Sequence, residues 1–360
     1  MRQDGRVTDS LFALLSRDWL GAPVAVLVVA VGGAMVGVGG AWAVALGGPA
    51  LAVGVLLAAG AVRHLVLVAR EARANPPPGR LVDVGGHRMH VLGAGDGGGG
   101  PTVVWMPGGH APGEDFRELH TLLSARARSV LVDRFGTGWS DVGPFPRTTA
   151  AEAEELSAAL EMAGERAPFV FVGHSFGGLL VANVARRRPE LVAGLVLLDP
   201  TPLEVIAFAP RNRQLEGMRR RILLTAVRQL FGAHRGRGER TGQLCAAASA
   251  FGELTPTGLA RVGWETVVYD GDLGNLPLVL VIPRDLIGGE AVLAGARDAV
   301  EAERISRFYL GSRVRYLAAS TASRLVHTPE GTGHDFPHEA PEFVVGVVGD
   351  LVRELRVVSP

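Results

Sequence analysis

The sequence contains no lysine and a single cysteine, Cys245. A lone cysteine cannot form an internal disulfide or a cysteine-based metal site, so we expect Cys245 to be a small buried apolar residue. Arginine supplies every basic side chain other than histidine, and it balances aspartate and glutamate to a formal net charge of +0. A neutral chain has no electrostatic basis for binding nucleic acid, and we expect no such partner.

A long stretch near the N-terminus has no charged residue, from just after Asp18 to just before Arg63. As a continuous helix it would be about 66 Å long, roughly twice the thickness of a hydrocarbon core. The sequence Gly-Gly-Pro at 47–49 interrupts its middle. The simplest interpretation is two transmembrane helices, at about 22–46 and 50–69, joined by a tight turn.

Arginines flank this apolar stretch on both sides. Those before it are Arg2, Arg6 and Arg17, and those after it are Arg63, Arg70 and Arg73. Because arginine favours the cytoplasmic side of a membrane, the pattern predicts a multi-pass membrane protein with two spans, whose domain after the spans lies in the cytoplasm. Residues 1–75 would form the membrane anchor, and the proline-rich segment 75–79 a short stiff linker.

Two other interpretations of the apolar stretch stay open. One is a signal peptide with a long apolar region, although Asp4 and Asp9 in the leading segment count against it. The other is a single span followed by a re-entrant or interfacial piece, because the glycine-rich segment 32–40 is weakly helical.

The strongest chemical signal is the sequence Gly-His-Ser-Phe-Gly at 173–177. A short, wholly apolar run precedes it, as in a strand that is buried on both faces, and a helical pattern follows it. Glycines two before and two after Ser175 allow a sharp turn from strand to helix. The serine hydroxyl would then project above the sheet, where it could act as a nucleophile.

Four landmarks along residues 80–355 resemble the α/β-hydrolase family, and they follow the family's order. They are Met106-Pro107-Gly108-Gly109, the loop from Asp133 to Asp141, the elbow at Ser175, and Gly331-Thr332-Gly333-His334 with Glu342 in the C-terminal helical pattern. The resemblance implies an α/β fold with a nucleophilic serine, a histidine base from the final loop and an acid.

Strand and helix patterns alternate after the anchor, which predicts a mostly parallel sheet with helices on both faces. Predicted strands lie at 81–84, 89–92, 102–105, 129–132, just before the elbow, and at 193–198, 277–282 and 323–327. Residues 80–200 and 276–360 would form the core. The arginine-rich helical stretch 201–275 falls where the family carries a cap. Its arginines fit either a solvated face or contact with anionic lipid headgroups.

The resemblance points to His334 as the base, since the family places its histidine in this loop. Two acids stay open, because both Asp199 and Asp285 follow predicted strands. Most relatives use the later position, and some lipases use the earlier one. The gap from Asp285 to His334 is longer than is usual in the family, and it holds two extra helical patterns at 290–301 and 305–319.

An oxyanion hole needs two backbone donors. The N–H of Phe176 is one candidate, and Gly109, with Gly108 adjacent, is the other. The family's usual His-Gly is absent here, because Pro107 stands in place of the histidine. We expect Asp133 and Asp141 to order their loop rather than to react.

These residues predict a membrane-anchored serine hydrolase that cleaves a carboxylic ester or related acyl bond through an acyl-enzyme. No metal or organic cofactor is implied. The anchor and the apolar cap suit a lipophilic small-molecule substrate at a lipid surface. Alternatives are a thioesterase, an aminopeptidase-like hydrolase with Glu253 or Glu265 holding the substrate amine, and a catalytically silent binding protein on the same fold.

Overall fold

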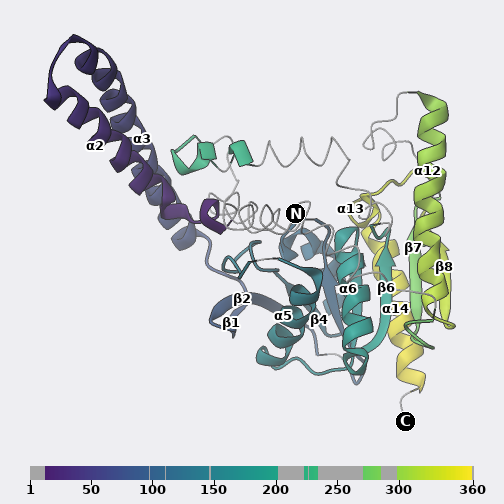
Figure 1. Cartoon of the computed structure of the whole chain (residues 1–360). Helices are drawn as coiled ribbons and strands as arrows, with labels where there is room; N and C mark the ends of the chain where they lie inside the picture. The colour runs from purple at the N-terminus through teal and green to yellow at the C-terminus, as the bar shows by residue number, and fades with distance from the viewer. Residues whose placement is uncertain are drawn as a thin grey trace.

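A computed structural model describes residues 13–96, 98–109, 111–145, 147–201, 223–225, 227–233, 271–284 and 298–358. Most of the predicted cap at 201–275, together with Cys245, Glu253, Glu265 and Asp285, lies outside these residues. The described chain forms an α/β core from which a pair of long helices projects (Figure 1).

The core is built on an eight-stranded sheet in the order β1-β2-β4-β3-β5-β6-β7-β8. Its strands are β1 Arg80–Val84, β2 His87–Ala94, β3 Thr102–Met106, β4 Ser129–Val132, β5 Phe169–His174, β6 Val192–Leu198, β7 Leu278–Ile282 and β8 Ser323–His327. Strand β2 pairs antiparallel with β1 and β4, and the remaining pairs are parallel. The predicted mostly parallel sheet is therefore confirmed.

Helices cover both faces of the sheet, as predicted. They are α4 Arg117–Ser124, α5 Thr149–Met162, α6 Phe176–Arg187, α12 Ala299–Val314, α13 Phe336–Glu339 and α14 Pro341–Val358. Alternate residues of a strand point to opposite faces. In β3, Val104 and Met106 join the core beneath α5 and α6, whereas Val103 and Trp105 join the core beneath α4 and α14.

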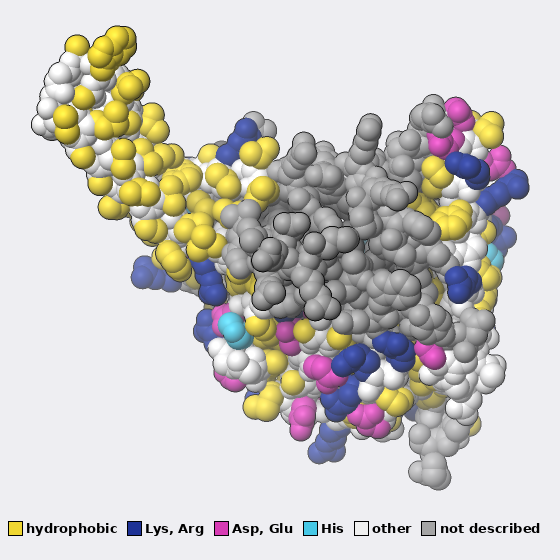
Figure 2. All heavy atoms as spheres, in the orientation of Figure 1, with side chains coloured by type: hydrophobic (Ala, Val, Ile, Leu, Met, Phe, Trp, Pro, Cys, Tyr) yellow, Lys and Arg dark blue, Asp and Glu magenta, His cyan; other side chains and the backbone are white. Residues whose placement is uncertain are grey.

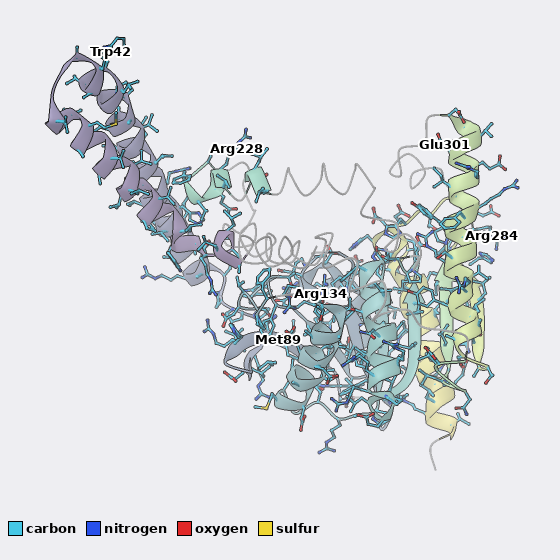
Figure 3. All side chains as sticks on the ribbon, in the orientation of Figure 1. Trp42, Met89, Arg134, Arg228, Arg284 and Glu301 are labelled. Carbon is cyan, nitrogen blue, oxygen red and sulfur yellow. The ribbon has the colours of Figure 1, made fainter. Side chains whose placement is uncertain are left out.

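The projecting pair consists of α2 Gly21–Val38 and α3 Ala41–Ala74. Both helices are long and apolar enough to cross a membrane, and 17% of the most apolar stretch of each is buried. Their surface is largely apolar, and charged side chains gather at the base and on the core (Figure 2). Trp42 lies at the far end of the pair (Figure 3).

The turn between the helices falls earlier than predicted, so the expected boundaries of 22–46 and 50–69 are wrong. The chain reverses at Gly39 and Gly40, whose φ angles of 74° and 88° are accessible mainly to glycine. Pro49 lies inside α3 and does not end it.

Gly47, which suggested a turn, packs the two helices together instead, as does Gly54 further along α3. A Cβ on Gly47 would lie 2.8 Å from Cβ of Met35, and one on Gly54 would lie 2.7 Å from the backbone nitrogen of Val29. Such small residues let helix backbones approach closely. A glycine pair in an apolar sequence therefore fits either a turn or an interface.

The base of the hairpin contacts a short segment that belongs to the insertion between β6 and β7. Residues 227–233 lie beside α3, and Arg228 is labelled there (Figure 3). Arg63 donates a hydrogen bond to the carbonyl oxygen of Gly232, and Leu230 packs against Leu15. A Cβ on Gly60 would overlap the carbonyl oxygen of Phe231. Residues 227–233 of the insertion thus pack against the base of the helical hairpin.

Candidate active site

Ser175 lies at the sharp turn between β5 and α6, with φ 52° and ψ −121°. A non-glycine residue rarely adopts this conformation, so the turn is strained. Glycine is required on either side of it. A Cβ on Gly177 would overlap the carbonyl oxygens that end β3, and one on Gly173 would lie 2.5 Å from the carbonyl oxygen of Gly177. The two glycines of the motif are therefore explained by packing around the serine.

Main-chain hydrogen bonds hold the strained residue in place. The Ser175 N–H donates to the carbonyl of Leu198 at 3.1 Å, and the Ser175 carbonyl accepts from Gly178 at 3.0 Å and Thr201 at 2.9 Å. Leu198 and Thr201 flank the end of β6, so the serine turn and the loop after β6 are tied together.

His334 and Asp199 meet at the same edge of the sheet. The Nδ1 of His334 lies 2.6 Å from Oδ2 of Asp199, across 135 positions of the chain. The aspartate side chain is buried, whereas that of His334 is 38% exposed and is accessible from solvent. Asp199 adopts φ 39°, and its N–H donates to the carbonyl of Val281 at 2.7 Å. Among the described residues, Asp199 is the acid that contacts His334, and Asp285 lies outside them.

His174, the residue before Ser175, braces the loop that carries His334. Its Nε2 donates to the main-chain oxygen of His334 at 2.9 Å, and the two imidazole rings lie 4.6 Å apart. Burial, followed by the charge of His334, lowers the pKa of His174 to about 3. His174 is therefore neutral at physiological pH. In that form Nε2 must carry the proton, because its partner is a carbonyl oxygen.

The same loop is braced from within. Thr332 Oγ1 lies 2.7 Å from Oγ1 of the buried Thr328, and the Gly333 N–H donates to Glu339 at 2.8 Å. These contacts, with His174, fix the main chain on both sides of His334.

The loop after β3 lies against the nucleophile turn. A Cβ on Gly108 would lie 2.9 Å from Cβ of Ser175, and Gly109 has φ 40°. On the other side, Phe176 is the first residue of α6, where backbone N–H groups have no acceptor within the helix. Gly108 and Phe176 thus lie on either side of Ser175, and Gly109 follows Gly108 in the chain.

Asp133 and Asp141 order the loop after β4, as expected. Asp133 accepts from the Gly113 N–H at 2.6 Å and the Trp139 N–H at 2.9 Å, and it also binds His90. Asp141 pairs with Arg88 on the neighbouring strand. Both carboxylates therefore bind groups of the surrounding loops and strands.

Sequence reasoning did not single out Arg313. It lies in the last turn of α12, with its side chain 4% exposed, and its Nε is 2.8 Å from Oδ1 of Asp199. The helical spacing around it predicts a helix, but no local signal shows that this arginine reaches the end of β6. Within the described residues, no group of three or more histidine, cysteine or acidic residues could hold a metal ion.

Comparison with known proteins agrees with this geometry. The model of a family described as the alpha/beta hydrolase family matches residues 103–347. A putative carbamate hydrolase, RutD of Klebsiella pneumoniae, is 34% identical over 127 residues, covering 35% of this chain and 46% of that protein. An uncharacterized Bacillus subtilis protein, YbdG, is 29% identical over 140 residues, covering 38% and 42% respectively. The chain thus spans less than half the length of these curated relatives.

A solved structure shares the fold at low sequence identity. A probable hydrolytic enzyme from Pseudomonas aeruginosa aligns with a TM-score of 0.55 at 22% identity, over 76% of this chain and 93% of that one. The matched family residues extend from β3 to α14 and include Ser175, Asp199 and His334. The chain therefore belongs to the alpha/beta hydrolase family.

Proposed function

We propose that the protein is a serine hydrolase that cleaves a carboxylic ester or related acyl bond through a covalent acyl-enzyme. The observation that carries this proposal is the 2.6 Å contact between His334 Nδ1 and Asp199 Oδ2, at the sheet edge where the strained turn presents Ser175. A hydroxyl is a weak nucleophile by itself, and an oriented imidazole is what activates it.

The chemistry follows from the donors and acceptors at the site. Asp199 accepts the Nδ1 proton of His334, which leaves Nε2 as a base. As His334 takes the Ser175 proton, the Ser175 oxygen attacks the acyl carbon and forms a tetrahedral intermediate. His334 then gives that proton to the leaving group, and the C–O bond of the ester breaks. Water, deprotonated by the same imidazole, hydrolyses the acyl-enzyme and restores the serine.

The negative charge of the tetrahedral intermediate would be met by the N–H groups of Phe176 and Gly109. Phe176 follows Ser175 and begins α6, so the positive end of the helix dipole lies at the same place, and Gly109 follows Gly108, which lies against Ser175. Gly108 allows the loop after β3 to lie close to the serine, since a side chain there would collide with Ser175.

The substrate class is an acyl compound of low molecular weight. The similarity to a putative carbamate hydrolase, and the shared fold of a thermophilic esterase from Thermogutta terrifontis, support hydrolysis of an acyl bond. The aminopeptidase-like alternative depends on Glu253 or Glu265, which lie outside the described residues. Turnover of thioesters in preference to oxygen esters would favour the thioesterase alternative. Absence of turnover with either would favour the catalytically silent binding protein.

The helical hairpin would anchor this site to a membrane. Its long apolar helices expose valine and leucine along their length, and tryptophans lie at both ends: Trp19 at the base is 55% exposed and Trp42 at the tip is 84% exposed. Tryptophan favours the two membrane–water interfaces. Because Arg17 and Arg63 lie near the base, the base and the catalytic domain would face the cytoplasm.

Anchoring would place the site near lipid. The insertion after β6 is seated on the hairpin base through Leu230, Phe231 and Gly232. A lipophilic acyl substrate that partitions into the bilayer would then be concentrated next to the insertion.

The catalytic proposal is tested by ester hydrolysis with the full chain in detergent, using p-nitrophenyl esters of graded acyl length. We expect turnover that rises with acyl length and that Ser175→Ala abolishes. Ser157→Ala is the matched control, because Ser157 is a buried serine in α5 whose hydroxyl donates to the Ala153 carbonyl one turn earlier. Activity that survives Ser175→Ala would overturn the proposal.

The membrane proposal has its own test. We expect the protein to remain in the membrane pellet after alkaline carbonate extraction, and residues 80–360 to resist protease added outside intact cells. Release by carbonate would contradict anchoring, and digestion from outside would contradict the cytoplasmic orientation.

A further inference from the structure

A buried arginine completes the environment of the proposed catalytic acid. Arg313 Nε lies 2.8 Å from Asp199 Oδ1, and the two side chains are 4% and 3% exposed. The Nε–H donates its hydrogen bond to the carbonyl of Pro200 at 3.1 Å, so the contact between Arg313 and Asp199 Oδ1 is an ion pair rather than a hydrogen bond. We infer that Arg313 is a positioning residue, which holds the Asp199 carboxylate in place and adjusts the basicity of His334. This inference rests on the proposed serine hydrolase function.

The two oxygens of Asp199 have separate partners. Oδ2 meets the imidazole of His334, and Oδ1 meets the guanidinium of Arg313. The hydrogen bond at Oδ2 and the ion pair at Oδ1 together favour the orientation in which Oδ2 faces Nδ1 of His334. The guanidinium charge also compensates a carboxylate that is removed from water, since a buried charge is costly when it is left alone.

The end of α12 and the 3-10 helix η6 Arg315–Ala319 that follows it also hold the main chain after Asp199. Arg313 binds the Pro200 carbonyl, and the buried Tyr316 donates through its hydroxyl to the Thr201 carbonyl at 3.3 Å. Thr201 in turn donates its N–H to the carbonyl of Ser175 at 2.9 Å. A helix in the long interval between β7 and β8 therefore supports both the acid and the nucleophile turn.

The charges around His334 act on its proton in opposite senses. The Asp199 carboxylate favours the protonated imidazole, and the Arg313 guanidinium behind it disfavours that form. His174, packed on the other side of the ring, is neutral because burial lowers its pKa to about 3. His338 of α13 is exposed, and it pairs with Asp115 at 3.2 Å. Removing the Arg313 charge should let His334 hold its proton to a higher pH.

The readout is the pH dependence of the rate at which a fluorophosphonate probe labels Ser175 in the full chain. The acidic limb of this profile reports deprotonation of the histidine in the free enzyme. For Arg313→Gln we expect the acidic limb to move up by about one pH unit and the limiting rate to fall about tenfold. A merely structural arginine would lower the amount of labelled protein and would leave the limb in place.

Two further variants make the test specific. Arg313→Lys keeps a charge but lacks the guanidinium geometry, so we expect the limb within about 0.3 pH units of wild type and a limiting rate at least about threefold lower. Arg307→Gln is the matched control, because Arg307 lies on the same helix, is 75% exposed and pairs with Glu303. It should match wild type in both measurements.

The outcomes separate this inference from the function on which it rests. A folded Arg313→Gln variant with a wild-type limb would overturn the inference. If Arg313→Gln does not fold, the Arg313→Lys variant takes its place. A limiting labelling rate equal to that of wild type, or an acidic limb shifted upward by one pH unit, would also overturn the inference. Failure of the wild-type chain to react with the probe at all would instead refute the serine hydrolase proposal.

Discussion

The ring of His174 donates a hydrogen bond from Nε2 to the main-chain oxygen of His334, at 2.9 Å. The residue next to the proposed nucleophile thereby holds the loop that delivers the proposed base. The variable position of the Gly-x-Ser-x-Gly motif is thus a structural link between the ends of β5 and β8, and its side chain is buried.

Replacing His174 should loosen this link. We expect His174→Leu to lower the rate of probe labelling about tenfold, because the His334 carbonyl loses its donor and the loop shifts. His174→Gln keeps an N–H donor and should retain most of the rate. His338→Gln, at an exposed imidazole on α13, is the control. A His174→Leu variant that labels like wild type would show that the bond does not position His334.

Acid should destabilise the fold through two buried histidines. Burial lowers the pKa of His120 to about 4 and that of His174 to about 3, both below the unfolded value of 6.5. Their contribution is fully present above pH 6.5 and is lost as the pH falls toward 4 for His120 and toward 3 for His174, because the unfolded chain takes up protons that the folded chain excludes.

We therefore expect the free energy of unfolding to fall by on the order of 2 kcal/mol per histidine between pH 6.5 and 4. Denaturant unfolding followed by tryptophan fluorescence measures it. In His120→Gln the free energy of unfolding should depend less steeply on pH than in wild type. In the control His327→Gln, at an exposed histidine, the dependence should match wild type. An unchanged slope in His120→Gln would contradict the assignment.

The seating of the insertion on the hairpin can be tested with two glycines of one helix. A Cβ at Gly60 would overlap the Phe231 carbonyl, whereas a Cβ at Gly48 would meet nothing within 4 Å. Gly60→Ala should displace residues 227–233 and make trypsin cleave after the exposed Arg228 about tenfold faster, because local opening controls cleavage. Gly48→Ala should be cut at the wild-type rate. Equal cleavage in the two variants would argue against this contact.

The identity of the acid is open to direct measurement. Asp199→Asn should lower the turnover of a p-nitrophenyl ester about a thousandfold or more, because the amide cannot hold the imidazole in the required tautomer. Asp285→Asn should stay within about threefold of wild type. The reverse ranking, or equal residual activity in both variants, would remove Asp199 from the proposed triad.

Much of the core follows from local pattern. The strand predicted at 129–132 is β4, where Ser-Val-Leu-Val is a short buried run of strand length, and the one predicted at 323–327 is β8. The turn of the hairpin was misplaced for a physical reason. Gly47 serves a helix–helix contact, and sequence alone does not distinguish that use from a bend.

The site residues also differ in how far the sequence predicts them. Ser175 and His334 lie in short motifs, so their places in a turn and a loop can be predicted from neighbouring residues. Asp199 and Asp285 both follow strands, and only the three-dimensional arrangement shows that Asp199 contacts His334. Arg313 could not be found, because its meeting with Asp199 joins two elements that are far apart in sequence and leaves no periodic signal.

The central claim is that Ser175 is a nucleophile activated by His334. Its most direct test is to react the full chain with a fluorophosphonate and to locate the adduct by peptide mass spectrometry. The account predicts one phosphonyl group, on Ser175, and no adduct in a His334→Ala variant over the same reaction time. An unmodified Ser175, or an adduct that forms equally fast without His334, would contradict it.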